Sequence, residues 1–222
     1  MGNKRRSNNG IQGASLTKKV FYPKTDKQER AFNSRKNLVM SGSAGTGKTF
    51  VCLNLALEDL FNGVYQKIII VRSIVPTRDI GFLPGTLAEK CSVYEAPYRQ
   101  IVIELFGRGD AYEILKQKGI IEFVPTSFIR GVTLDNTVVI VDESQNMTLH
   151  ELDSIATRLG KNCRFMVCGD YRQADLPNNG FKTFLKILEY TNSFDMIEFN
   201  TEDIVRSGFV RRYIEARNEL NL

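Results

Sequence analysis

The chain has 222 residues, of which 42% are hydrophobic and 25% are charged, and its net charge at pH 7 is +5. This length is enough to bury a sizeable core, and the composition is typical of a soluble globular protein. No apolar run approaches the roughly 18 residues that a membrane-spanning helix needs, which argues against a membrane protein.

Charge is distributed unevenly along the chain. Residues 1–36 carry a net charge of +8, so the remainder carries −3. Residues 1–17 are rich in Gly, Asn, Ser, Lys and Arg, and we expect them to form a disordered basic leader, followed by one domain over 18–222. A basic leader could contact nucleic-acid phosphates or could be a solvated tail. The start is not a secretory signal and the cysteines form no CxxC pair, so we expect a cytoplasmic protein with free thiols.

Short apolar runs alternate with longer helical patterns after the leader. The strands expected in chain order are 37–41, 67–71, 120–124, 137–141, 164–168 and 195–199, and the expected helices are 48–62, 87–106, 110–118, 148–159, 180–190 and 208–219. Several strands are continuous apolar runs, as in a parallel sheet covered on both faces. The alternation predicts an α/β fold with a mostly parallel, doubly wound sheet flanked by helices.

A glycine-rich loop joins the first expected strand to the first expected helix. Its sequence GSAGTGKT matches the pattern G-x-x-x-x-G-K-[ST] in the strand-to-helix context that the pattern requires. Its amide groups can surround phosphates, the lysine can reach the β- and γ-phosphates, and the last hydroxyl can bind Mg²⁺. The predicted nucleotide-binding residues are Gly42, Ser43, Ala44, Gly45, Thr46, Gly47, Lys48, Thr49 and the following Phe50.

Segment 71–85, VRSIVPTRDIGFLPG, follows the second strand. Arg72 and Arg78 could meet nucleic-acid phosphates, and Phe82 could stack on a base. The alternative is a structural loop packed over the sheet.

An acidic pair ends the fourth strand, in the sequence VVIVDESQN. Ligands of open α/β sheets bind at the carboxyl ends of the strands, so Asp142 is placed to orient Mg²⁺ and Glu143 to activate water. No Asn-Lys-x-Asp guanine reader is present, which disfavours a GTPase, and nothing points to a nucleotide kinase. A further strand leads into VCGDYRQADLP, in which Gln173 could sense the γ-phosphate.

These three motifs, in this order, resemble motifs I, II and III of superfamily 1 helicases. More specifically, FYPKTDKQERAF, IGFLPGTLAEK, FIRGVTLDNTVVIVDESQN, TRLGKNCRFMVCGDYRQADLP and DIVRSGFVRRYI are similar to blocks of the PhoH-like family, over about residues 18–217. The resemblance implies a RecA-like P-loop ATPase that needs ATP and Mg²⁺ and has an RNA-linked role, such as a helicase. Ser144 departs from the family, which usually has Ala, and Tyr171-Arg172 stands where Pro-Ser is usual.

The resemblance also implies further site residues. By itself Gln28 could be an ordinary surface residue, but the resemblance matches it to a glutamine that reads the adenine edge, and Tyr22 could stack nearby. A cation is needed on the γ-phosphate, and this chain has no room for a second RecA-like domain to supply it. Either a neighbouring subunit supplies the arginine or intrinsic turnover is slow. We predict a ring, as a hexamer, with Arg206 and Arg130 as the candidate arginines and Arg158 and Arg211 behind them. Single-stranded RNA is the expected partner. The alternative is a nucleotide-gated module that binds RNA or protein without unwinding.

Overall fold

The computed structural model describes residues 16–74, 87–129, 131, 133–170 and 180–220. Its centre is a six-stranded sheet in the order β3-β2-β4-β5-β1-β6, and every adjacent pair is parallel. The strands are β1 (Asn37–Gly42), β2 (Lys67–Arg72), β3 (Ile121–Pro125), β4 (Thr137–Val141), β5 (Arg164–Gly169) and β6 (Phe194–Phe199). All six lie within one residue of the expected bounds, so the predicted parallel α/β fold is confirmed.

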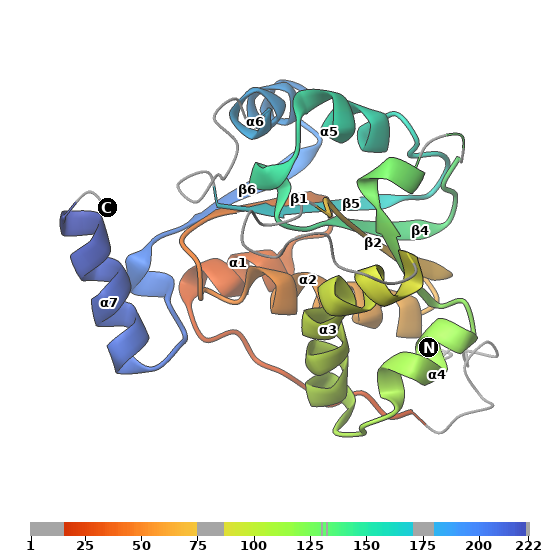
Figure 1. Cartoon of the computed structure of the whole chain (residues 1–222), viewed down its shortest axis with the longest axis horizontal. Coiled ribbons are helices and arrows are strands. Elements are labelled where there is room, and N and C mark those ends of the chain that lie inside the picture. Colours follow the sequence, from red (N-terminus) through yellow and green to blue (C-terminus); the bar gives the residue numbers. More distant parts are fainter. Residues whose placement is uncertain (1–15, 75–86, 130, 132, 171–179, 221–222) are drawn as a thin grey trace, which may run out of the picture.

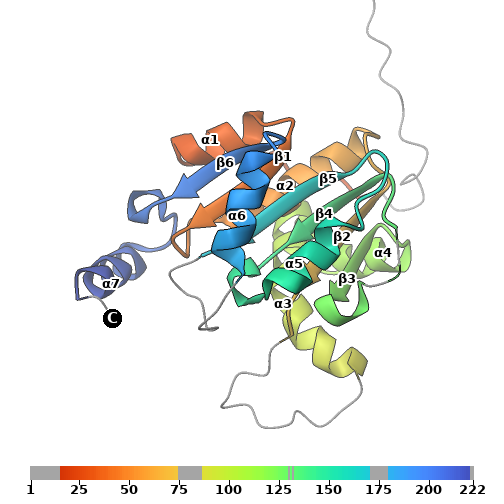
Figure 2. The same ribbon diagram turned by 90° about the horizontal axis from the view of Figure 1, so that it is seen from above.

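Helices cover both faces of this sheet (Figure 1). One face carries α1 (Asp26–Asn33), α2 (Lys48–Phe61), α3 (Leu87–Phe106) and α4 (Ala111–Gln117), and the other carries α5 (Leu149–Ala156) and α6 (Phe181–Tyr190). Short 3₁₀ turns lie at Thr126–Phe128, Ser144–Asn146 and Thr201–Asp203. The last helix, α7 (Gly208–Glu219), stands beside the sheet and not on either face (Figures 1 and 2).

The core consists of two apolar layers separated by the sheet. Side chains alternate across a strand, so β4 sends Val138 and Ile140 into the layer under α1–α4, and Val139 and Val141 into the layer under α5 and α6. This double burial explains why the strands are continuous apolar runs in the sequence.

Helix α1 was not predicted. Only two of its eight residues, Ala31 and Phe32, are apolar, so no hydrophobic periodicity marks it. A capping signal was present, because Thr25 lies three residues before Gln28 and its hydroxyl accepts the Gln28 backbone N–H at 3.2 Å. Leu16, which falls in the expected leader, is 7% exposed and belongs to the core layer under α1–α4.

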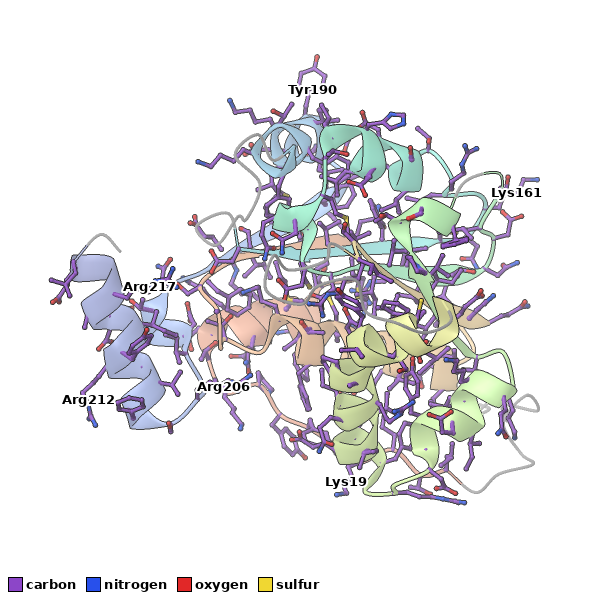
Figure 3. The ribbon with its side chains drawn as sticks, in the orientation of Figure 1. Lys19, Lys161, Tyr190, Arg206, Arg212 and Arg217 are labelled. Carbon is purple, nitrogen blue, oxygen red and sulfur yellow. The ribbon has the colours of Figure 1, made fainter. Side chains whose placement is uncertain are left out.

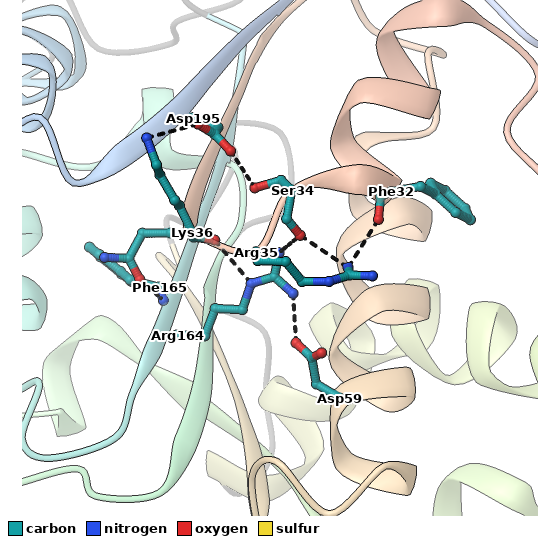
Figure 4. A network of polar contacts seen from close by, with 9 residues as sticks. Phe32, Ser34, Arg35, Lys36, Asp59, Arg164, Phe165 and Asp195 are labelled. Carbon is teal, nitrogen blue, oxygen red and sulfur yellow. Dashed lines mark hydrogen bonds and ion pairs between the residues drawn. The ribbon is translucent and has the colours of Figure 1, made fainter. Parts of the chain in front are cut away.

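A buried arginine ties several elements together at the edge where the strands begin (Figure 4). The Arg164 side chain pairs with Asp59 of α2 at 2.6 Å, and it donates to the carbonyls of Ser34 and Lys36 at 3.0 and 3.1 Å. Each of the three guanidinium nitrogens thus has a partner, and Arg164 of β5 connects α2 with the segment between α1 and β1. This network fixes the edge of the sheet opposite the glycine-rich loop.

Candidate functional site

The carboxyl ends of four neighbouring strands converge at one edge of the sheet. Register pairs Ser41 with Gly169, and Val141 with both Val167 and Val71, so the residues that follow these strands lie side by side. The strand order reverses at β1, which places this edge at the switch point where ligands of doubly wound sheets bind. A cavity of about 820 Å³ opens here, within the usual range for small-molecule sites.

The glycine-rich loop wraps the start of α2. Gly42 has φ +103°, and a Cβ at this position would lie 2.1 Å from the Phe199 carbonyl oxygen, so no other residue fits against β6. Gly47 has φ +83° and precedes α2 without capping it through a side chain. The first amides of α2 therefore remain available for an anion.

Lys48 is folded into the loop. Its Nζ donates to the carbonyls of Gly42 and Ser43, each at 2.7 Å. Burial lowers the pKa of Lys48, although Cys168, Asp170, Asp142 and Glu143 act in the opposite direction. Because burial disfavours the ammonium form of Lys48, a nearby anion would stabilise it. The predicted phosphate contact would supply such an anion.

Asp142 and Thr49 meet as the sequence predicted. The Thr49 hydroxyl donates to the two Asp142 carboxylate oxygens at 3.1 and 3.2 Å. Asp142 is 5% exposed, and its pKa is raised by burial and by the charge of Glu143, against the effects of Tyr98, Arg72 and Thr49. A divalent cation would offset this cost, and hydroxyl and carboxylate oxygens are the donors that Mg²⁺ prefers. The residues present therefore fit a magnesium ion.

Gln145, to which the sequence analysis assigned no role, holds the Glu143 side chain in place. Glu143 has φ +51°, in the left-handed region, and the Gln145 amide donates to its carboxylate at 2.6 Å. The other end of the same amide accepts the Asp170 backbone N–H at 3.0 Å. Gln145 thus joins the acidic pair to the end of β5. Its place two residues after that pair was the only signal for it in the sequence.

Ser144, the departure from the family pattern, also has a structural role. Its hydroxyl donates to the Cys168 carbonyl at 2.5 Å, and a Cβ at Gly169 would come within 2.4 Å of the same hydroxyl oxygen. The serine therefore adds a second connection between the ends of β4 and β5.

Gln28 lies against the loop and is 5% exposed. Its amide nitrogen donates to the Thr46 carbonyl at 2.9 Å, and its amide oxygen accepts the Lys24 N–H at 2.8 Å. In this arrangement both ends of the amide contact the protein. The structure thus brings Gln28 to the nucleotide cavity, and the adenine contact stays a prediction.

Arg72 also lines the cavity. Its guanidinium carbon lies 5.7 Å from the Tyr94 ring centre. Burial acts to lower the pKa of Arg72, but Tyr98, Glu143 and Asp142 outweigh it and the net shift is upward. This position favours a contact inside the cavity over the predicted contact with a nucleic-acid strand.

The candidate arginines occupy different places. Arg206, labelled in Figure 3, lies against the glycine-rich loop of its own chain. The neighbouring Val205 N–H donates to the Gly45 carbonyl at 3.1 Å. A Cβ at Gly45 would be 3.0 Å from Arg206 Cγ. Arg211 donates to the carbonyls of Glu202 and Ile204, each at 2.9 Å, and so braces its own backbone. Arg158 follows α5, at the edge where the strands begin.

Four of the predicted residues cannot be placed. Arg78, Phe82, Arg130 and Gln173 lie outside the described residues. The remaining wall of the cavity includes four aromatic side chains, Phe21, Tyr22, Phe32 and Phe50, and the rings of Phe21 and Phe50 meet edge to face at 5.1 Å. In the part of the chain that the structure describes, no helix is both long and apolar enough to cross a bilayer.

A parallel sheet with a glycine-rich loop after β1 and an acid after β4 defines a P-loop nucleotide-binding protein. Among solved structures, the fold is similar to that of a large terminase from a thermophilic bacteriophage, with a TM-score of 0.56 and 14% identity over 87% of this chain and 50% of that one. The same terminase in complex with ADP gives a TM-score of 0.52 and 15% identity, with the same coverage.

Sequence comparison gives the family. The PhoH family, described as PhoH-like protein, matches residues 20–218, and the chain belongs to it. Relatives include the PhoH-like protein of Bacillus subtilis (strain 168), 38% identical over 84% of this chain, and Protein PhoH of Escherichia coli (strain K12), 34% identical over 84%. The chain spans 60% and 54% of the lengths of these relatives. The predicted family is thereby confirmed.

Proposed function

We propose that the protein hydrolyses ATP with Mg²⁺ and uses the cycle to act on single-stranded RNA. The observation that carries this proposal is the meeting of Thr49 and Asp142 at 3.1 Å beside Glu143, at the mouth of the phosphate-binding loop. A P-loop that only bound a nucleotide would not require a second carboxylate there. When bound, Mg²⁺ would neutralise phosphate charge and ATP would supply the phosphoryl group.

Each side chain has a role in this proposal. Lys48 exchanges its two carbonyl partners for phosphate oxygens, Thr49 and Asp142 hold the metal, and Glu143 accepts a proton from the attacking water. Gln145 keeps Glu143 oriented toward that water. Gln173 is proposed to report the γ-phosphate.

The base would occupy the aromatic part of the cavity. Phe50 follows the loop directly and contacts Phe21, so an apolar surface for a planar base adjoins the phosphate site. Gln28 reads adenine in this proposal only if its amide leaves Thr46 or Lys24.

Arg206 supplies the cation that phosphoryl transfer needs. Its contact with Gly45 puts it on the cavity wall of its own chain, which removes the need for a neighbour to provide this particular side chain. Arg130 remains the candidate from a neighbouring subunit in a hexameric ring. A cytoplasmic location fits this RNA-linked role.

A coupled phosphate-release assay with and without single-stranded RNA tests the function. We expect RNA to stimulate release by wild-type protein, and Glu143→Gln to lower turnover by roughly a hundredfold or more while ATP binding persists. ATP binding with negligible wild-type turnover would instead support the nucleotide-gated binding module. Phosphate moving to an acceptor other than water would identify a kinase.

A further inference from the structure

A buried tyrosine hydroxyl contacts the acid of the proposed metal site. Tyr98 is fully buried, and its OH donates to Asp142 Oδ2 at 3.0 Å. Thr49 contacts the same carboxylate from the side of the loop, at 3.1 and 3.2 Å. The carboxylate is therefore held from two directions, by α2 and by α3, and only the first contact belongs to the loop motif.

The fold directs this hydroxyl with several restraints. Pro97 lies inside α3, where it cannot donate the usual helical hydrogen bond, and the two halves of the helix run in different directions (Figure 1). Tyr98 follows this proline directly, and its ring packs on Phe123 of β3 with centres 5.8 Å apart. The ring is thus fixed between α3 and the sheet.

Arg72 completes the arrangement. It lies over the Tyr94 ring, one turn before Tyr98, with its guanidinium carbon 5.7 Å from the ring centre. Its positive charge influences the pKa values of both Tyr98 and Asp142. A nearby cation favours the tyrosine orientation in which the hydroxyl proton points to the carboxylate.

We propose that Tyr98 is a positioning residue, whose hydroxyl orients the Asp142 carboxylate for Mg²⁺. One carboxylate oxygen is engaged by the tyrosine, which limits rotation of the group and leaves lone pairs directed toward Thr49 and the loop. Partners of this kind typically change metal affinity by about 10- to 100-fold. This inference rests on the proposed magnesium-dependent function.

The chain offers a matched control for the test. Tyr112 of α4 is as buried as Tyr98, and its hydroxyl also contacts a carboxylate, Glu95 Oε2 at 3.4 Å. Asp142 lines the cavity, and Glu95 is not among the described residues that line it. Tyr98→Phe and Tyr112→Phe therefore remove the same group from equally buried places. Both changes keep the ring and its packing.

The readout is binding and not turnover. In the full chain, a fluorescent non-hydrolysable ATP analogue is titrated with Mg²⁺. We expect Tyr98→Phe to raise the Mg²⁺ midpoint about tenfold, with little change in analogue affinity at saturating Mg²⁺, and Tyr112→Phe to match wild type. In an Asp142→Asn background, Tyr98→Phe should cause no further shift, because the hydroxyl has lost the charge it orients.

The outcomes separate this inference from the function on which it rests. An unchanged midpoint in Tyr98→Phe, or an equal shift in Tyr112→Phe, overturns the positioning role while the function stands. A wild-type protein whose analogue binding ignores Mg²⁺ overturns both. Thermal unfolding in the same buffers shows whether the Tyr98→Phe chain has kept its fold. If Tyr98→Phe still shifts the Mg²⁺ midpoint in the Asp142→Asn background, the hydroxyl contributes to stability alone, and the proposal is overturned.

Discussion

At the scale of single residues, two charged side chains of the site lie where burial disfavours their charged forms. Asp142 is buried beside Glu143, and both burial and this neighbour raise its pKa. Lys48 is half-buried among backbone carbonyls, and this partial burial lowers its pKa. Both groups are disfavoured until a partner arrives, as expected of residues kept for binding and not for stability.

Asp142→Asn should therefore stabilise the protein without nucleotide. The change removes a buried charge and its repulsion with Glu143, while an amide oxygen remains to accept from Tyr98. We expect a gain of about 1 kcal/mol, or roughly 2–4 °C in Tm at neutral pH, together with a higher Mg²⁺ midpoint for nucleotide binding. Differential scanning calorimetry measures this, with Asp153→Asn at an exposed position of α5 as control. An unchanged or lower Tm for Asp142→Asn would contradict it.

Sequence reasoning found the residues of this site that belong to local motifs. Lys48, Thr49, Asp142 and Glu143 are named by short patterns, and the structure brings them together. Tyr98 was missed in this role because its hydrogen bond to Asp142 joins elements far apart in the chain. No local pattern marks a tyrosine inside a long helix as the partner of a distant acid.

At the scale of elements, side-chain caps mark where α1 and α5 begin. Helix α5 starts with a capping box, in which Thr148 accepts the Glu151 N–H and Glu151 accepts the Thr148 N–H. The Glu151 carboxylate also accepts from the Thr126 hydroxyl at 2.7 Å, which connects α5 to the turn after β3. Burial acts to raise the pKa of Glu151, but these hydrogen bonds outweigh it and the net pKa is lowered.

Glu151→Gln should lower the free energy of unfolding by about 1 kcal/mol at pH 7. Because the folded pKa of Glu151 lies below its ordinary value, its charge contributes stability above that ordinary value, and the contribution is lost as the pH falls through the folded pKa. The difference from wild type should shrink between roughly pH 5 and pH 3. Urea denaturation across this range tests it, with Glu189→Gln on the exposed side of α6 as control. A difference that does not depend on pH would count against the charge as its cause.

The strands were predictable and α1 was not, for a physical reason. A strand covered on both faces must be apolar throughout, so 137–141 and 164–168 are visible as continuous runs. Helix α1 is short and mostly polar, and its stability comes from its cap and from packing Ala31 into the core. Such a helix depends on tertiary contacts that periodicity does not reveal.

At the scale of the whole molecule, the exposed position of α7 is relevant to the proposed ring. None of the described side chains of α7 is buried, and Phe209 and Tyr213 are 70% and 61% exposed. An isolated helix of this length has only marginal stability in water.

We expect light scattering with ATP and Mg²⁺ to show an assembly near six times the 25.2 kDa chain mass. A species of only one chain mass under these conditions would exclude the ring.

The central claim is that the two acids after β4 meet a metal-bound triphosphate held by the loop after β1. The most direct measurement is a crystal structure of the full chain with Mg²⁺ and a non-hydrolysable ATP analogue. We predict Mg²⁺ at about 2.1 Å from Thr49 Oγ1, with Asp142 bound directly or through one water, and Glu143 within reach of a water in line with the γ-phosphate. A terminal phosphate well away from Glu143, or a metal that ignores Asp142, would contradict this mechanism.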